Sequence, residues 1–247
     1  MLLKEKVCLV TGANKGIGKA IALSFAKEGA IVYAHARELN NIKDWAEDLS
    51  QKFNTKVVPI YFNLEDFEDA RNKVLKIKSN EGRVDVLVNN AGMVTYEMVP
   101  MVQIDVFKKM IDVNVLGTFN LLQVVSRIMS RQKSGSIINI ASIVGEKGAK
   151  GQVSYSTSKG AVIAMTKAAA KEFASSNIRV NAIAPGMVET ERFKNVFEQK
   201  FKEKINDIGM GRLANPSEVA EACVFFAGNN SKYITGQILG IDGSLEI

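Results

Sequence analysis

The stretch Lys6-Val-Cys-Leu-Val-Thr-Gly-Ala-Asn-Lys-Gly-Ile-Gly18 sets the fold of this 247-residue chain. Its first half is a short apolar run rich in β-branched residues, which predicts a buried strand, and its second half is a glycine-rich turn. A helical pattern follows, with apolar residues from Ile21 to Ala26. This order predicts a phosphate site, because glycines let the backbone approach closely and a helix N-terminus offers unpaired N–H groups. A tight turn without a ligand is the alternative, since the glycine spacing departs from G-x-G-x-x-G.

The rest of the chain alternates strands with helices at similar spacing. We expect further strands over residues 30–36, 56–62, 84–88, 136–141, 179–184 and 237–241, and a long helix over about 104–131. This alternation predicts an α/β fold, a doubly wound parallel sheet of Rossmann type with helices on both faces. The ligand site of such a sheet lies at the carboxyl ends of its strands. No linker or repeat interrupts the pattern, so we expect residues 1–247 to form a single domain.

Composition and charge bound the class of protein. A hydrophobic content of 47% with 23% charged residues is typical of a soluble globular protein. The apolar runs are too short to span a bilayer and the N-terminus does not resemble a signal peptide, so we expect a cytoplasmic protein without a membrane partner. The net charge is +6, but the lysines are scattered among acids, and we expect no nucleic-acid partner.

Cysteine and histidine usage argues against metal chemistry. Cys8 and Cys223 lie in apolar runs, which predicts reduced core residues. The chain has one histidine, His35, so a His-based metal site or catalytic triad is excluded. His35 falls in the second predicted strand, and we expect a structural role for it. We expect no bound metal.

The end of that second strand bears on the choice of cofactor. An NAD site of this type places an acidic residue about 20 residues past the glycines, where it binds the ribose 2′-hydroxyl. Ala36 and Arg37 stand there instead. An arginine suits a 2′-phosphate through charge-assisted bonds, and Lys15 adds a second cation. The sequence therefore favours NADP (NADPH) over NAD. The alternatives are that Glu38 acts as an offset acid and that Arg37 is a solvated loop residue.

The stretch Tyr155-Ser-Thr-Ser-Lys159 carries the strongest chemical signal. Two residues four apart lie on one face of a helix, so the ammonium of Lys159 can sit beside the phenol of Tyr155. A neighbouring cation stabilises a phenolate and lowers the pKa of a tyrosine, which makes it a proton donor at working pH. Alone, the same pattern also fits a solvated helix start with Ser154 or Ser156 as its cap.

Six motifs in register resemble the short-chain dehydrogenase/reductase family, and the resemblance covers essentially the whole chain. They are Thr11-Gly12-x-x-x-Gly16-Ile-Gly18, Asn89-Asn-Ala-Gly92, Asn114, Ser142, Tyr155-x-x-x-Lys159 and Pro185-Gly186. The resemblance implies an enzyme, a carbonyl/alcohol oxidoreductase.

By position, the resemblance also implies roles for single residues. Tyr155 would protonate the carbonyl oxygen and Ser142 would hydrogen-bond it. Lys159 would lower the pKa of Tyr155 and bind the nicotinamide ribose, and Asn114 would order a water that relays protons to Lys159. Substrate contacts would come from Ser142, Gln152 and Tyr155. Cofactor contacts would come from Gly12, Asn14, Lys15, Gly16, Ile17, Gly18, Arg37, Asn63, Leu64, Asn90, Ala91, Gly92, Tyr155, Lys159, Pro185, Gly186, Val188 and Thr190.

Within the family, three stretches are most similar to 3-oxoacyl-[acyl-carrier-protein] reductases: Gly211-Arg-Leu213, Pro216-Ser-Glu-Val-Ala220 and Tyr233-Ile-Thr-Gly-Gln237. This similarity implies reduction of a 3-oxoacyl thioester in fatty-acid synthesis, an acyl carrier protein as partner, and a homotetramer. Three positions depart from the pattern: Asn63 replaces an aspartate, Asp242-Gly-Ser lacks a second glycine, and of two basic carrier-docking positions Lys133 matches while Ser176 does not.

Other functions remain open at this stage. A reductase of another ketone, such as a sugar, steroid or small ketone, would share the same motifs, and a cofactor-sensing protein without turnover would keep the fold. Residues 189–208 carry apolar side chains at helical spacing and predict a lid over the site, although an ordinary surface helix would show the same periodicity. Small residues after Tyr155 suggest close packing, consistent with a subunit contact.

Overall fold

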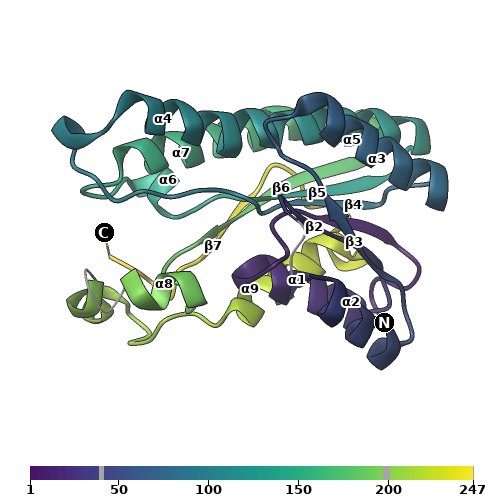
Figure 1. The fold of residues 1–247 in the computed structure, drawn as a ribbon, viewed down its shortest axis with the longest axis horizontal. Coiled ribbons are helices and arrows are strands. Elements are labelled where there is room, and N and C mark those ends of the chain that lie inside the picture. The colour runs from purple at the N-terminus through teal and green to yellow at the C-terminus, as the bar shows by residue number, and fades with distance from the viewer. Residues whose placement is uncertain (39–41, 197–200, 247) are drawn as a thin grey trace.

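The computed structural model describes residues 1–38, 42–196 and 201–246. Within them, seven strands form one parallel sheet in the order β3-β2-β1-β4-β5-β6-β7 (Figure 1). The predicted doubly wound α/β fold is confirmed, and each predicted strand is present within two residues of its expected bounds. The strands are β1 (Val7–Val10), β2 (Ile31–Ala36), β3 (Val57–Tyr61), β4 (Val86–Asn89), β5 (Gly135–Ile140), β6 (Ile178–Pro185) and β7 (Ile238–Ile241).

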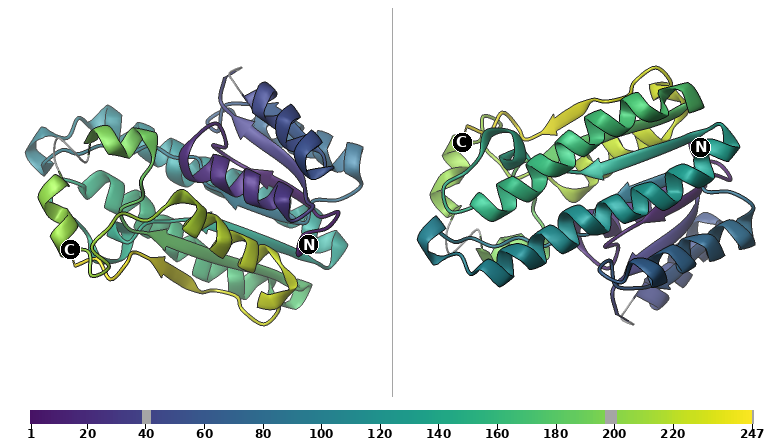
Figure 2. Two further views of the ribbon diagram at one scale, coloured as in Figure 1. Left: turned by 90° about the horizontal axis from the view of Figure 1, so that it is seen from below. Right: turned by 90° about the horizontal axis from the view of Figure 1, so that it is seen from above.

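Helices cover both faces of the sheet (Figures 1 and 2). One face packs against α1 (Gly16–Lys27), α2 (Ile42–Phe53) and α9 (Pro216–Ala227), and α1 and α9 lie side by side. The other face carries α3 (Phe67–Glu81), α5 (Gly117–Gln132) and α7 (Val153–Phe173). Each layer buries its own cluster of apolar side chains against the sheet. The structure therefore has the two cores that a sheet covered on both faces requires.

The strand order reverses between β1 and β4, which places a crevice at their carboxyl ends. β1 pairs with β2 on one side and with β4 on the other. Because parallel strands end at the same edge, the residues that follow β1, β4, β5 and β6 meet there. The sequence-predicted site residues Gly12, Asn90, Ser142 and Gly186 all follow one of these strands.

The long helix expected over residues 104–131 contains a wide turn. α4 (Ile104–Ile111) and α5 are joined by a π-helical segment, Asp112–Leu116, at whose end the N–H of Gly117 donates to the C=O of Asp112 five residues earlier. Asn114 lies in this segment and is fully buried. π-Helical turns are rare and are frequently found at functional sites. The helix prediction is correct in extent, but the periodicity gave no sign of the wide turn.

The segment predicted as a lid consists of two short helices in its described part. These are α8 (Glu191–Val196) and a 3₁₀ helix, Lys202–Asp207, while Phe197 and Lys200 lie outside the described residues. An antiparallel bridge joins Ile208 to Leu245 near the C-terminus. Further short helical segments are η1 (Val99–Met101), α6 (Val144–Lys147), η3 (Ala174–Ser176) and η6 (Asn229–Ser231).

The structure also places the two cysteines, the start of α9 and the turn near the C-terminus. Cys8 and Cys223 are free and buried, and burial raises the pKa of both thiols. Asn215 caps α9, which begins at Pro216, and forms a capping box with Glu218. Ser244 adopts a left-handed conformation with φ of 60°, so the turn keeps a glycine-like backbone where a second glycine is missing. In the described part of the chain, no helix is long and apolar enough to cross a bilayer.

Candidate active site

The glycine turn after β1 fits a dinucleotide phosphate. Gly12 has φ of 65°, and a Cβ built on Gly18 would lie 2.2 Å from the carbonyl oxygen of Gly12 and 2.5 Å from Nδ2 of Asn90. Only glycine allows these approaches. Lys15 precedes α1 without a side-chain cap, and the first turn of α1 has no acidic residue. The N-terminus of α1 therefore keeps backbone donors and positive dipole available for an anion.

Thr11 and Asn90 lock the turn to the end of β4. The Thr11 hydroxyl donates to the Val88 carbonyl at 3.2 Å and accepts from the N–H of Asn90 at 2.9 Å and of Ala91 at 3.0 Å. The Asn90 amide donates to the carbonyls of Thr11 at 2.9 Å and Gly12 at 3.2 Å. These bonds fix the crevice on both sides of the point where the strand order reverses.

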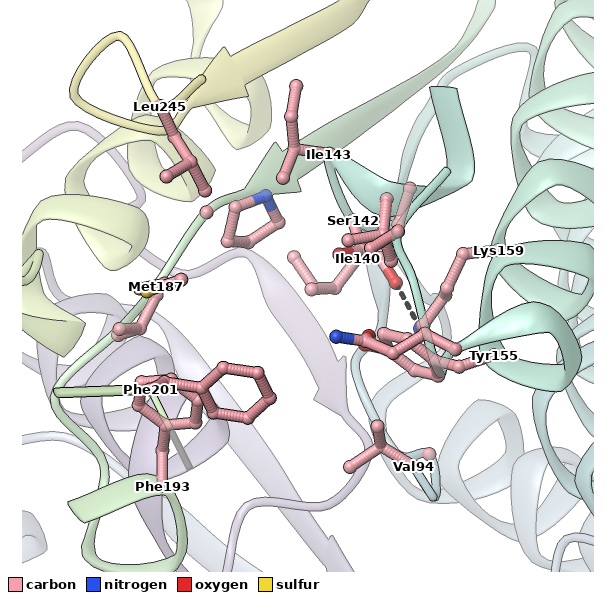
Figure 3. Close-up of a pocket in the computed structure, with 18 of the residues that line it drawn as sticks. Val94, Ile140, Ser142, Ile143, Tyr155, Lys159, Met187, Phe193, Phe201 and Leu245 are labelled. Atoms are coloured by element: carbon pink, nitrogen blue, oxygen red, sulfur yellow. Dashed lines mark hydrogen bonds between the residues drawn. The ribbon is translucent and has the colours of Figure 1, made fainter. Parts of the chain in front are cut away.

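Tyr155 and Lys159 lie together on the first turns of α7, as predicted from their spacing (Figure 3). The ammonium of Lys159 is 5.8 Å from the centroid of the Tyr155 ring and donates to the Ile140 carbonyl at 2.7 Å. This bond ties α7 to the end of β5, two residues before Ser142. Lys159 is buried, and the loss of hydration lowers the pKa of its ammonium to about 8.

Asn114 is held beside this group by three hydrogen bonds. Its Oδ1 accepts from the N–H of Met93 at 2.8 Å, and its Nδ2 donates to the carbonyl of Met93 at 2.9 Å and to Oγ of Ser158 at 3.0 Å. A Cβ built on Gly92 would lie 3.1 Å from Oδ1 of Asn114 and 3.7 Å from Nζ of Lys159. A side chain at position 92 would thus crowd the Asn114 amide oxygen and contact the Lys159 ammonium.

One cavity of about 400 Å³ gathers most of the predicted site. Ser142, Gln152, Tyr155 and Lys159 line it, and Asn114 stands behind Gly92. Seven other predicted cofactor contacts share the lining: Ile17, Asn90, Gly92, Pro185, Gly186, Val188 and Thr190. The fold thus brings together predicted site residues from five separate segments of the chain. In size, the cavity matches sites for small molecules and cofactors.

The wall opposite Tyr155 is apolar and aromatic (Figure 3). The rings of Phe193 and Phe201 stack with their centroids 6.1 Å apart, and Tyr96 is 5.2 Å from Phe201. This wall supports the lid prediction for the described residues of the 189–208 segment. Other apolar residues of the lining were not predicted, among them Val94 and Ile143, which lie on the side of Tyr155 and Ser142, and Met187 and Leu245. They come from loops and the C-terminus, where local sequence patterns carry no signal for a cavity.

The loop after β6 is fixed by the segment before α9. Met187 accepts from the N–H of Ala214 at 2.9 Å, and Glu189 donates its N–H to the Ala214 carbonyl at 2.8 Å. Thr190 directly precedes α8, and its hydroxyl accepts a hydrogen bond from the N–H of Phe193 at 3.2 Å. These contacts aim Val188 and Thr190 at the cavity.

The remaining predicted cofactor contacts do not line this cavity; they lie along the glycine turn and after β2, β3 and, for Ala91, β4. Asn14 and Lys15 are exposed on the turn. Arg37 follows β2 and pairs with Glu38 at 2.8 Å, with both side chains about two-thirds exposed. Asn63 accepts the N–H of Glu65 at 3.3 Å, and Leu64 is buried. Among the described residues, none of the acidic, histidine and cysteine side chains form a group that could hold a metal ion.

Comparison with known proteins agrees with this geometry. The family model described as short chain dehydrogenase matches residues 6–200. The chain is 42% identical over 247 residues to a 3-oxoacyl-[acyl-carrier-protein] reductase of Thermotoga maritima, covering 100% of both chains. It is 37% identical over 244 residues to a reductase of the same name from Chlamydia muridarum, covering 99% of this chain and 98% of that one.

Two further relatives have other names. A 3alpha-hydroxysteroid dehydrogenase of Mediterraneibacter gnavus is 36% identical over 245 residues, covering 99% of this chain and 98% of that one. A solved structure from Sinorhizobium meliloti, provisionally named a short-chain alcohol dehydrogenase, superimposes with a TM-score of 0.91 at 30% identity, covering 98% of this chain and 96% of that one. The chain belongs to the short-chain dehydrogenase family of oxidoreductases and is similar to 3-oxoacyl-[acyl-carrier-protein] reductases over its full length.

Proposed function

We propose that the protein is an NADPH-dependent carbonyl reductase that converts a 3-oxoacyl thioester to the 3-hydroxyacyl thioester in fatty-acid synthesis. The observation that carries this proposal is the cavity itself. Ser142, Tyr155 and Lys159 converge on one wall, and an aromatic and aliphatic wall faces them. The names of the Thermotoga and Chlamydia relatives support the choice of a carrier-linked 3-oxoacyl substrate.

The nicotinamide cofactor would supply the hydride when bound. Its phosphates would rest on the glycine turn and the N-terminus of α1, its ribose near Asn90 and Lys159, and its carboxamide near Val188 and Thr190. The absence of a side-chain cap on α1 and the close packing at Gly18 fit this placement.

The protein residues would handle the proton. Tyr155 donates its hydroxyl proton to the carbonyl oxygen, and Ser142 hydrogen-bonds the same oxygen as it gains negative charge. The Lys159 ammonium stabilises the phenolate that Tyr155 leaves behind. Asn114 would order a water that returns a proton to Lys159, next to Gly92, where no side chain stands between the two residues.

Arg37 and Lys15 support NADPH over NADH. The Arg37–Glu38 pair is exposed, and such pairs are worth only about 0–1 kcal/mol. A 2′-phosphate can therefore replace Glu38 as the partner of Arg37 at small cost. Arg37→Ala should weaken NADPH binding while changing NADH binding little, and Glu38→Ala should not weaken NADPH binding.

We also propose a homotetramer with residues 1–247 as one domain in each subunit. Exposed apolar side chains of α5, α7 and the π-helical segment before α5, including Phe119, Val153 and Leu116, support a contact with a second copy. Lys133 is the C-cap of α5 and comes just before β5. It therefore lies at the amino-terminal ends of the strands, whereas the cavity lies at their carboxyl ends. An acyl carrier protein docked at Lys133 would therefore serve the cavity of a neighbouring subunit.

The test is oxidation of NADPH and NADH, side by side, with an acetoacetyl thioester on a carrier protein and on coenzyme A. Turnover of the carrier-linked thioester with NADPH alone is the expected result. A preference for NADH would overturn the role given to Arg37.

A second candidate is a reductase or dehydrogenase of another apolar ketone, such as a steroid. The aromatic wall of Tyr96, Phe193 and Phe201 favours it as much as an acyl chain, and the Mediterraneibacter relative is named for a steroid. Turnover of steroid or simple ketones without turnover of either thioester would select this candidate.

A further inference from the structure

His35, the one histidine of the chain, lies beneath the glycine turn. It is 2% exposed on β2, and its ring packs against Phe62 with the centroids 3.9 Å apart. Nε2 lies 2.9 Å from the carbonyl oxygen of Phe62, and Nδ1 lies 3.3 Å from the backbone nitrogen of Gly12. A carbonyl oxygen only accepts, so Nε2 carries the proton and donates it. In the neutral ring Nδ1 is then a lone-pair acceptor for the N–H of Gly12.

The backbone of the same residue holds the next position of the turn. The carbonyl oxygen of His35 accepts the N–H of Ala13 at 2.7 Å. The first two N–H groups after Thr11 are therefore both directed inward to His35, one to its side chain and one to its main chain. Burial lowers the pKa of the His35 imidazole to about 4, which keeps Nδ1 an acceptor at neutral pH.

This anchoring affects the proposed phosphate site because the glycine turn is closely packed. Gly12 adopts a left-handed conformation, and its carbonyl oxygen is already in contact with Gly18 at the start of α1. A rotation of the Gly12 peptide would move that oxygen and the donors that follow it. Without an acceptor at position 35, the Gly12 N–H loses its partner, and unpaired donors in such places cost free energy.

We propose that His35 is a positioning residue for cofactor binding, acting by holding the Gly12–Ala13 peptide so that the turn and the N-terminus of α1 present their donors to the dinucleotide phosphates. The inference rests on the proposed function, since the ligand is a nicotinamide dinucleotide. It assigns a binding role to a side chain that the sequence marked only as structural.

Two variants of His35 separate this role from simple packing. In His35→Asn the amide oxygen replaces Nδ1 and still accepts from Gly12, whereas in His35→Gln the amide nitrogen replaces Nε2 and still donates to Phe62. Both lose the ring and its contact with Phe62, so both should be destabilised to a similar extent. We expect Kd for NADPH to rise about tenfold in His35→Gln, the effect of one lost hydrogen-bond partner. His35→Asn should stay within about threefold of wild type.

The measurement is NADPH binding to the variants by calorimetry or by cofactor fluorescence, with denaturant unfolding beside it. A second readout needs no cofactor: amide hydrogen exchange in the unliganded protein should be faster across residues 10–18 in His35→Gln than in His35→Asn. Equal Kd values for the two variants, or an unchanged Kd in His35→Gln, would overturn the proposal. Wild-type protein that binds neither NADPH nor NADH would instead overturn the proposed function, and the exchange comparison would still test the anchoring.

Discussion

Burial sets the charge of Lys159. Its ammonium donates to the Ile140 carbonyl, and the loss of hydration on burial brings its pKa down to about 8 from a usual value of 10.5. Below that pH the ammonium is charged and can stabilise a Tyr155 phenolate, and above it the amine is neutral. Activity and stability should therefore respond to alkaline pH in opposite directions.

We predict that kcat/KM for the cofactor, which reports groups of the free enzyme, falls as pH rises through about 8.

The free energy of unfolding should change the other way. Between pH 8 and 10.5 the unfolded chain binds more protons at this lysine than the folded one, so its contribution to unfolding free energy rises with pH, by about 3 kcal/mol in all. Urea unfolding of wild type and Lys159→Met across this range isolates the contribution. A loss of activity that tracked unfolding would contradict this account.

The sequence predicted single residues well where one helix or one strand end determines their position. Tyr155 and Lys159 are close because four residues make about one helical turn, and Ser142 meets them because it follows a parallel strand. The partners of Lys159 and His35 could not be predicted in this way. Ile140, Phe62 and Gly12 contact them only through tertiary packing, for which a single sequence has no periodic signal.

The π-helical segment between α4 and α5 is the element that places Asn114. Its wide turn coincides with the three hydrogen bonds that Asn114 makes to Met93 and Ser158. Helical periodicity over 104–131 predicted the helix but not this turn, because the bonds that accompany it come from the loop after β4 and from α7. Gly92 in that loop lies against Asn114, where an added Cβ would be only 3.1 Å from the amide oxygen.

We predict that Gly92→Ala lowers kcat while the protein stays folded and still binds NADPH. The added methyl would lie 3.1 Å from the Asn114 oxygen and 3.7 Å from the Lys159 nitrogen, filling the space through which a water would reach the lysine. We expect a fall of about 10- to 100-fold in kcat, in the lower range for lost proton transfer. Thermal unfolding and NADPH binding serve as the measurements that separate this effect from misfolding. Ala161→Gly on α7 is the control: it loosens the helix that carries Lys159 without filling any space. Gly148→Ala would not serve, because Gly148 has a positive φ and an alanine there would be strained.

The molecule as a whole has two covered sheet faces and an exposed apolar surface on the outer side of α5. Phe119 and Leu116 on this side are 47% and 41% exposed. A monomer would leave these side chains in water, and burying them against a second copy would stabilise an assembly. The sheet and its layers were predicted from alternating strands and helices. The homotetramer stays a proposal: the resemblance implies it, and in the sequence only the small residues after Tyr155 and the long helix through Asn114 support it.

We predict that Phe119→Glu reduces the size of the assembly, since a charge on an apolar contact surface is costly to bury. Leu75→Glu is the matched control, because Leu75 on α3 is similarly exposed at 42% but lies on a different helix. Size-exclusion chromatography with light scattering should show a smaller species for Phe119→Glu alone. A wild-type protein that is a stable and active monomer would rule out the tetramer.

The central claim is that this cavity performs carbonyl reduction with Tyr155 as the acid, rather than sensing a cofactor. The most direct measurement is the single-turnover rate of Tyr155→Phe, with NADPH bound and with whichever substrate the wild type turns over. The account predicts a rate about 10²- to 10⁴-fold below wild type with cofactor binding retained, because the phenyl ring keeps its place and loses only the hydroxyl group that donates the proton. An unchanged rate in Tyr155→Phe would contradict it.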